Sequence, residues 1–173
     1  VRESWSKYWL VDPLDGTREF VKKNGEFTVN IALIENGEPI LGVVYAPVLD
    51  WMLVGARGIG ASWFKGQNSG VAKVVSASTP LKVAASRSHR DEKTQAYLDK
   101  IGAVDTVGLG SSLKFCKIAS GEIDLYPRFG PTSEWDTAAA QAVLEAAGGG
   151  VFTLDGQPLR YNQKASLLNP HFI

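Results

Sequence analysis

The sequence has little cysteine, little methionine and no excess of charge of either sign. Cys116 is the only cysteine among the 173 residues, so no disulfide can form within the chain, and we expect a reducing compartment, the cytoplasm. Lysine plus arginine and aspartate plus glutamate number 18 each. Because a chain without a basic excess does not attract a polyanionic backbone, we expect no nucleic-acid polymer as a partner.

Long hydrophobic runs are also missing. No apolar stretch reaches the ~20 residues that a membrane-spanning helix needs, and the first residues do not resemble a signal peptide. With 45% hydrophobic residues, the chain can still bury a core, and its length fits one ordinary domain or two small ones. The chain starts at Val1 and its only methionine is Met52, so we interpret it as a piece whose N-terminal part is left out. The sequence does not indicate an oligomeric state.

The patterning changes near residue 80. Before it, apolar runs separated by turn residues such as Asn36-Gly37 predict an antiparallel sheet. After it, strands alternate with helices, which is typical of an α/β layer. The expected strands are 8–11, 27–34, 39–47, 52–56, 60–64, 71–76, 81–85, 104–107, 123–126, 151–153 and 166–168, and the expected helices are 91–101, 111–119 and 137–147. We therefore predict a mixed α/β (α+β) fold with two domains, residues 1–80 and 81–173.

The segment Asp12-Pro13-Leu14-Asp15-Gly16-Thr17 follows the first predicted strand. The proline holds Asp12 in extended geometry, and Gly16 permits the turn that follows. Two carboxylates and the Leu14 carbonyl thus crowd one small space, and like charges this close repel unless a cation lies between them. Oxygen ligands of this kind suit Mg²⁺, and the Thr17 hydroxyl would lie beside it. The alternative is an ordinary turn, because Asp-Pro and Asp-Gly are common in loops.

A second acidic motif, Glu134-Trp135-Asp136, precedes the alanine-rich predicted helix. Asp136 can be the N-cap of that helix, which contributes about 1 kcal/mol. A helix N-terminus also attracts anions. The sequence alone leaves both interpretations open.

Both motifs resemble those of a known family. The string from Trp9 to Thr17 and the string Trp135-Asp136-Thr137-Ala138-Ala139 are similar to the two metal motifs of the inositol monophosphatase superfamily, which contains Mg²⁺-dependent, lithium-sensitive phosphatases. The resemblance implies a layered αβαβα sandwich. It also implies that relatives have N-terminal helices and strands, with a further glutamate and aspartate, that this chain lacks, so that only part of the metal shell is expected here.

The resemblance assigns roles to the motif residues. Asp12, Asp15, Asp136 and the Leu14 carbonyl would hold two or three Mg²⁺ ions, and a metal-activated water would hydrolyse a phosphate monoester. Thr17 would orient this water, with Asp12 and Asp15 as the other catalytic residues. Substrate would contact Asp15, Asp136 and the backbone N–H groups of Gly16 and Thr17.

Further segments resemble the branch of the superfamily that hydrolyses the 3′-phosphate of 3′(2′)-phosphoadenosine 5′-phosphate, a nucleotide bisphosphate, to give AMP. These segments are 25–33, 42–47, 86–89, 110–116 and 126–132. The sulfated form of this nucleotide is a second substrate that the resemblance implies. Some members are described as peripheral on the inner membrane face, and nothing in this sequence anchors the chain there.

A bisphosphate needs a second set of donors. His89 follows a predicted strand, and Lys114 lies one turn into a helix that Ser111 and Ser112 begin, which suits a second phosphate. Ser86 and Gly110 belong to the same matching segments and are counted with the substrate contacts. The alternatives are a surface loop histidine for His89 and a solvated helix face for Lys114. For Arg128, a position near the substrate and a role in bracing its loop are both open, with bracing favoured.

Two other functions stay open. One is hydrolysis of inositol or sugar monophosphates within the same superfamily. The other is a non-catalytic module that binds phosphonucleotides, which would apply if the protein lacks the upstream acidic ligands.

Overall fold

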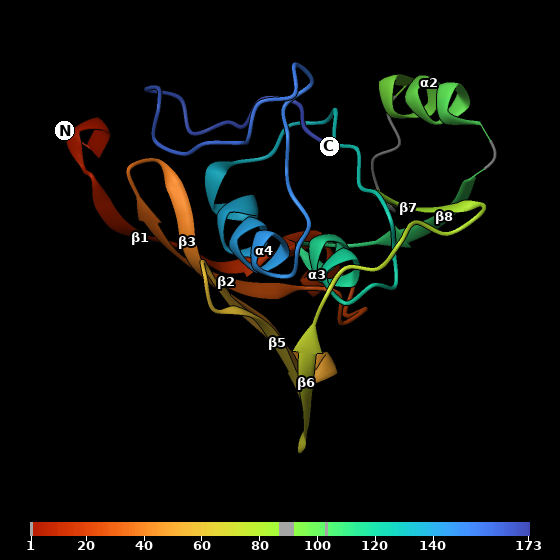
Figure 1. The fold of residues 1–173 in the computed structure, drawn as a ribbon, viewed down its shortest axis with the longest axis horizontal. Coiled ribbons are helices and arrows are strands. Elements are labelled where there is room, and N and C mark those ends of the chain that lie inside the picture. The colour runs from red at the N-terminus through yellow and green to blue at the C-terminus, as the bar shows by residue number, and fades with distance from the viewer. Residues whose placement is uncertain (1, 87–91, 103) are drawn as a thin grey trace.

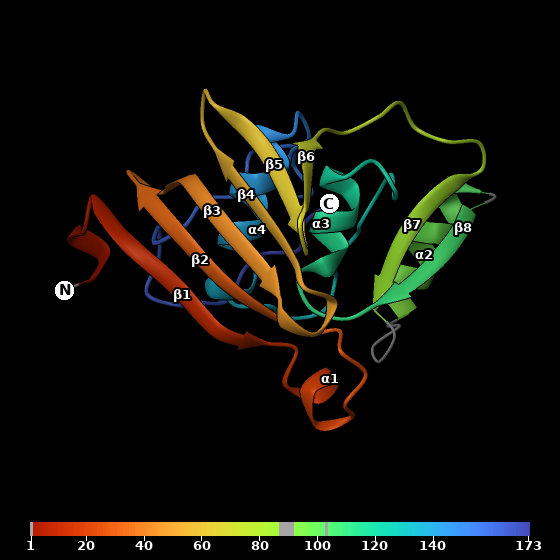
Figure 2. The ribbon, with the colours of Figure 1, turned by 90° about the horizontal axis from the view of Figure 1, so that it is seen from below.

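The computed structural model describes residues 2–86, 92–102 and 104–173, and its largest element is a six-stranded antiparallel sheet. The strands lie side by side in chain order (Figure 2), with each strand next to its sequence neighbour. Short helical turns η1 (Arg2–Ser4) and η2 (Pro47–Leu49) and the helix α1 (Thr17–Val21) lie at the ends of strands. The strands are β1 (Lys7–Asp15), β2 (Thr28–Glu35), β3 (Glu38–Ala46), β4 (Trp51–Ala56), β5 (Gly60–Lys65) and β6 (Asn68–Ala72).

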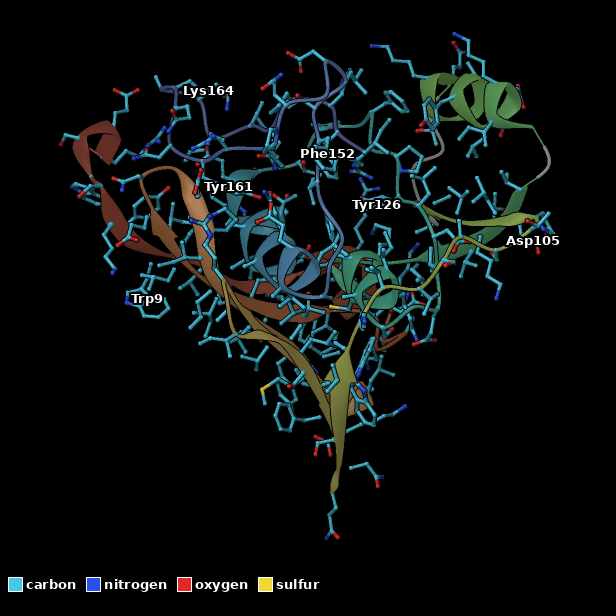
Figure 3. All side chains as sticks on the ribbon, in the orientation of Figure 1. Trp9, Asp105, Tyr126, Phe152, Tyr161 and Lys164 are labelled. Carbon is cyan, nitrogen blue, oxygen red and sulfur yellow. The ribbon has the colours of Figure 1, made fainter. Side chains whose placement is uncertain are left out.

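The two faces of this sheet differ in burial because side chains alternate along each strand. In β2 every second residue is buried, and Ala32 and Ile34 are fully covered. On the opposite face Trp9 is 58% exposed and Val11 is 48% exposed. Figure 3 shows Trp9 on the side of β1 away from α4. Within the described residues, the helices that pack on the sheet therefore cover one face of it.

Helices α4 (Glu134–Ala146) and α3 (Leu113–Ala119) cover the buried face (Figure 1). Glycines in the sheet allow α4 to approach closely. A Cβ added at Gly42 would lie 2.0 Å from the Ala139 carbonyl oxygen, and one at Gly55 would lie 2.6 Å from the Val143 Cα. The small residues that the sequence places in α4 thus fit against small residues of β3 and β4. No helix of the described part of the chain combines the length and apolarity that crossing a bilayer requires.

A smaller unit follows the sheet. Strands β7 (Leu81–Ser86) and β8 (Val104–Leu109) pair in parallel, and α2 (Glu92–Ile101) lies between them in the chain. Figure 2 shows this pair apart from the six-stranded sheet. The predicted mixed fold, an antiparallel sheet followed by a smaller α/β part, is confirmed. The division into two domains at residue 80 stays a prediction.

The C-terminal segment has few backbone pairs but is bound tightly to α4. The fully buried Tyr161 donates its hydroxyl hydrogen to Gln141 Oε1, at 2.6 Å, or to Thr137 Oγ1, at 3.0 Å. The carboxylate of Glu134, at the start of α4, accepts the Asn162 N–H at 3.0–3.1 Å. This segment therefore holds the beginning of α4 in place.

Some expected elements differ from the structure. The last strand of the sheet is β6 at 68–72 rather than 71–76, and α1 was not expected. The strands expected at 123–126, 151–153 and 166–168 are reduced to isolated bridges, such as Val83 with Leu125. A single bridge leaves the neighbouring residues without ladder partners, so an apolar run there does not form a regular strand.

Candidate metal and phosphate site

Three carboxylates from distant parts of the chain meet at one end of the sheet. Asp12 and Asp15 lie near the end of β1, and Asp136 lies in the first turn of α4. Each offers an oxygen atom, and these atoms all lie within 4.8 Å of one another. The contact exists because α4 packs across the strands of the first half.

An irregularity in β1 lets two of these carboxylates converge. Residues three apart in a regular strand point to opposite faces. Here Asp12 pairs with Asn30 whereas Asp15 pairs with Thr28, so β1 uses one more residue than β2 over this interval. The extra residue acts as a β-bulge and turns both aspartates toward the same site. Pro13 lies within this interval. Because proline has no backbone N–H, it is tolerated at a bulge, where the residue makes no hydrogen bond to the neighbouring strand.

Asp15 is the most heavily hydrogen-bonded of the three. Its Oδ2 accepts the Ser112 N–H at 2.7 Å, and longer bonds come from the Asn30 amide at 3.3 Å and the Thr28 hydroxyl at 3.4 Å. Burial raises the pKa of Asp15, and the nearby Lys114 ammonium opposes this change. The carboxylate is thus fixed in orientation before any ligand arrives.

Asp136 has a structural role in α4, but the N-cap of this helix is Ser133, and Asp136 lies three residues further on. Its Oδ2 accepts the Ser133 N–H at 2.7 Å, which forms the return bond of a capping box. Burial, together with the charges of Asp15 and Asp12, raises the pKa of Asp136 to about 6. Close carboxylates that disfavour each other's ionisation, with oxygen as the only donor atom, fit a hard divalent cation.

A cavity of about 220 Å³ opens beside Asp15 and Asp136. Lys114 lines it and is buried. Its Nζ donates to the carbonyl oxygens of Ser111 at 2.7 Å and Leu109 at 3.4 Å, and it lies 5.1 Å from the centre of the Tyr126 ring. Burial lowers the pKa of Lys114 to about 8. A cation thus lies in the same cavity as two of the carboxylates.

The structure brings together most of the predicted site residues. The cavity is lined by Asp15, Gly16, Thr17, Gly110, Lys114 and Asp136, and Asp12 joins the carboxylate cluster. Leu14 lies between the two aspartates, and its N–H donates to Asp12 Oδ1 at 3.0 Å. The metal contact of its carbonyl stays a prediction.

Two of the predicted phosphate contacts are not placed. Ser86 ends β7 opposite Leu109, but its side chain lies outside the described residues, as does the whole of His89. Their roles stay predictions.

Tyr126 and Thr132 also line the cavity and were not predicted. Arg128, for which substrate contact and loop bracing were both open, lines the cavity and donates to the Pro131 carbonyl at 3.1 Å, so its position is compatible with both. Ser112 joins Asp15 to Asn30, whose Oδ1 accepts the serine hydroxyl at 2.8 Å. The sequence signal for these residues was their presence in the matching segments at 25–33, 110–116 and 126–132.

Comparisons with known proteins agree with this geometry. The model of the inositol monophosphatase family matches residues 2–171. The 3′(2′),5′-bisphosphate nucleotidase CysQ of Escherichia coli (strain K12) is 53% identical over 174 residues, which cover 99% of this chain and 69% of that protein. The crystal structure of CysQ from Bacteroides thetaiotaomicron superposes with a TM-score of 0.92 at 42% identity, covering 99% and 70% of the two chains. The structure of an inositol monophosphatase from Zymomonas mobilis superposes with a TM-score of 0.79 at 27% identity, covering 96% of this chain and 64% of that chain.

Proposed function

The chain belongs to the inositol monophosphatase family, and we propose that it hydrolyses the 3′-phosphate of 3′-phosphoadenosine 5′-phosphate to give AMP and phosphate. The observation that carries this proposal is the buried Lys114 in the same cavity as Asp15 and Asp136. A monophosphate substrate needs the carboxylate cluster alone, whereas a bisphosphate needs a second cationic position. Relatives more than 50% identical to this chain are bisphosphate nucleotidases, which supports the same substrate class.

The carboxylate cluster would hold Mg²⁺, in two or three ions. Asp12, Asp15, Asp136 and the Leu14 carbonyl supply oxygen donors only, and the mutual distances within 4.8 Å allow shared ligation. Bound Mg²⁺ supplies positive charge at the phosphate and lowers the pKa of a water molecule. No cysteine or histidine among the described residues lines the cavity, so this part of the chain offers no such nucleophile.

The remaining steps belong to residues of this chain. Thr17 lines the cavity, where its hydroxyl would accept a hydrogen bond from the attacking water and orient it. The N–H groups of Gly16 and Thr17 would bind oxygens of the 3′-phosphate. The Lys114 ammonium and the Ser111 hydroxyl would bind the 5′-phosphate, together with Ser86, His89 and the Gly110 turn. Arg128 lines the cavity and would add a second cation there.

Substrate comparison tests the proposal. The purified protein is assayed in Mg²⁺ with 3′-phosphoadenosine 5′-phosphate, its sulfated form, 3′-AMP and inositol 1-phosphate. We expect kcat/KM to be highest for the bisphosphates, and a chelator to abolish turnover. A preference for inositol 1-phosphate would overturn the substrate assignment. Tight binding of the bisphosphate with no release of phosphate would instead favour the non-catalytic module.

A further inference from the structure

Two short segments meet between the carboxylate cluster and Lys114. The first, here the metal loop, is residues 15–17. The second, here the phosphate turn, is residues 109–112, which connects β8 to α3. The phosphate turn supplies both carbonyl oxygens that hold the Lys114 ammonium. The position of this cation therefore follows the position of the turn.

Two carboxylates hold the phosphate turn from the side of the sheet. Asp15 Oδ2 accepts the Ser112 N–H at 2.7 Å, and Glu26 Oε2 accepts the Gly110 N–H at 2.9 Å. Ser111 lies between these two anchors with a φ of 45°, a backbone conformation that non-glycine residues seldom adopt. Two charge-assisted hydrogen bonds, one on each side of Ser111, hold the turn in this geometry.

The metal loop and the phosphate turn are in close contact. A Cβ at Gly110 would lie 2.4 Å from Glu19 Cγ and 2.9 Å from the Glu26 carbonyl oxygen. A Cβ at Gly16 would lie 3.2 Å from Ser111 Cβ. The Gly110 contacts are with Glu19 and Glu26, on the segment that follows the metal loop, and the Gly16 contact joins the metal loop to the phosphate turn directly. The two segments therefore lie close together.

Glu26 is itself held in place. Its N–H donates to Asn24 Oδ1 at 2.9 Å, and the preceding Gly25 is buried with a φ of 79°. Its negative charge also acts on the Lys114 ammonium. It raises the pKa of Lys114 and so opposes the lowering that burial causes. Glu26 is not a member of the carboxylate cluster, so its effect can be separated from that of the metal ligands.

We propose that Glu26 is a positioning residue that sets the separation between the 3′-phosphate subsite at the metal loop and the 5′-phosphate subsite at the phosphate turn. This inference rests on the proposed function. Glu26 acts through the Gly110 N–H and does not touch the reacting atoms. It makes the site selective for a nucleotide that carries both phosphates.

Two variants and two substrates test this role. Glu26→Ala removes the acceptor for the Gly110 N–H, and we expect the KM for 3′-phosphoadenosine 5′-phosphate to rise about ten-fold, which corresponds to about 1.4 kcal/mol. The values of kcat and KM for 3′-AMP, which has no 5′-phosphate, should change less than about two-fold, because the metal loop keeps its own bonds. Glu26→Gln keeps an acceptor oxygen and should restore most of the lost affinity.

A matched control and a binding assay make the result decisive. Glu35→Ala removes a surface carboxylate at the end of β2, where it pairs with Lys7, and should leave kcat and KM unchanged for both substrates. Calorimetry with AMP and no Mg²⁺ should show about ten-fold weaker binding to Glu26→Ala, in line with the loss of one charge-assisted bond. Equal losses on both substrates, or unchanged AMP binding, would defeat the role of Glu26. A wild-type protein that does not hydrolyse the bisphosphate would defeat the proposed function instead, while the AMP assay still decides on Glu26.

Discussion

Asp15 is placed so that one side chain serves two neighbours. Its Oδ2 holds the Ser112 N–H of the phosphate turn, and the carboxylate also belongs to the acidic cluster. A neutral amide can still accept the backbone bond but is a poor ligand for a hard cation. The two roles can therefore be separated by a single isosteric substitution.

We expect Asp15→Asn and Asp136→Asn each to lower kcat by at least about 100-fold, as losses of metal ligation typically do. The reason is the removal of a carboxylate from the cluster while the hydrogen bonds around it keep an acceptor. Addition of Mg²⁺ should raise the Tm of the wild-type protein by mass action, and this rise should disappear in both variants. Asp105→Asn, at an exposed position on β8 (Figure 3), is the control. Near-normal Mg²⁺-dependent turnover in either variant would contradict the ligand assignment.

Lys114 predicts a pH dependence. Its pKa in the folded protein is lowered to about 8 by burial, so the free protein loses this charge as the pH rises through 8. We expect the KM for 3′-phosphoadenosine 5′-phosphate to rise above pH 8, by at most about ten-fold per pH unit. The KM for 3′-AMP should stay flat, and Lys114→Ala should remove the difference between the two profiles. Parallel profiles for the two substrates would contradict the 5′-phosphate role.

The same group affects stability in a defined direction. The unfolded chain holds the Lys114 proton up to a pH near its ordinary pKa of 10.5, whereas the folded chain releases it from about 8. Between these values the unfolded state binds more protons, so the contribution of this residue to the free energy of unfolding increases as the pH rises. Denaturant unfolding of the wild-type protein and of Lys114→Met between pH 7 and 10 measures this contribution as the difference between their free energies of unfolding.

At the scale of helices and strands, the arrangement depends on close packing between α4 and the sheet. Gly42 of β3 faces the Ala139 carbonyl with no room for a methyl group. The start of the same helix carries Asp136, so a displacement of α4 moves a member of the acidic cluster. We therefore expect protein stability and metal affinity to be coupled through this helix.

We expect Gly42→Ala to lower the free energy of unfolding by about 1–3 kcal/mol, the usual cost of overpacking. Because α4 must shift, the Mg²⁺-induced rise in Tm should also become smaller. Ser69→Ala, at an exposed position of β6, is the control and should change neither quantity. An unchanged Mg²⁺ response in Gly42→Ala would contradict the coupling between this packing and the cluster.

The sequence predicted those elements whose formation depends on residues close together in the chain. The hairpin at Asn36-Gly37 and the alanine-rich helix follow from turn chemistry and small residues, and the structure confirms both. The β1 bulge and the bond between Glu26 and Gly110 were not predicted. Both depend on pairing with residues far along the chain, and no local pattern encodes the partner.

For the molecule as a whole, one core joins both halves of the chain. Ile34 and Leu53 of the sheet belong to the same hydrophobic cluster as Phe115 and Leu144 of the helices. Cys116 lies in this cluster, and burial raises the pKa of its thiol to about 12. A thiol that is both covered and protonated reacts only when the core opens.

We therefore expect a thiol reagent such as 5,5′-dithiobis(2-nitrobenzoic acid) to leave the native protein unmodified on the time scale of minutes. In denaturant, one thiol per chain should react, because Cys116 is the only cysteine. The labelling rate should match the global unfolding rate measured by far-ultraviolet circular dichroism. Fast labelling without unfolding would show that α3 separates from the sheet on its own.

The wide sequence separation of Asp15 and Asp136 has a consequence for synthesis in the cell. Translation delivers the strands first and α4 late, and contacts between such remote segments form slowly. If Asp136 is a metal ligand as proposed, a nascent polypeptide gains hydrolytic capacity only after α4 has emerged from the ribosomal exit tunnel and docked. We then expect a chain that terminates before this helix to be an inert product that does not consume nucleotide.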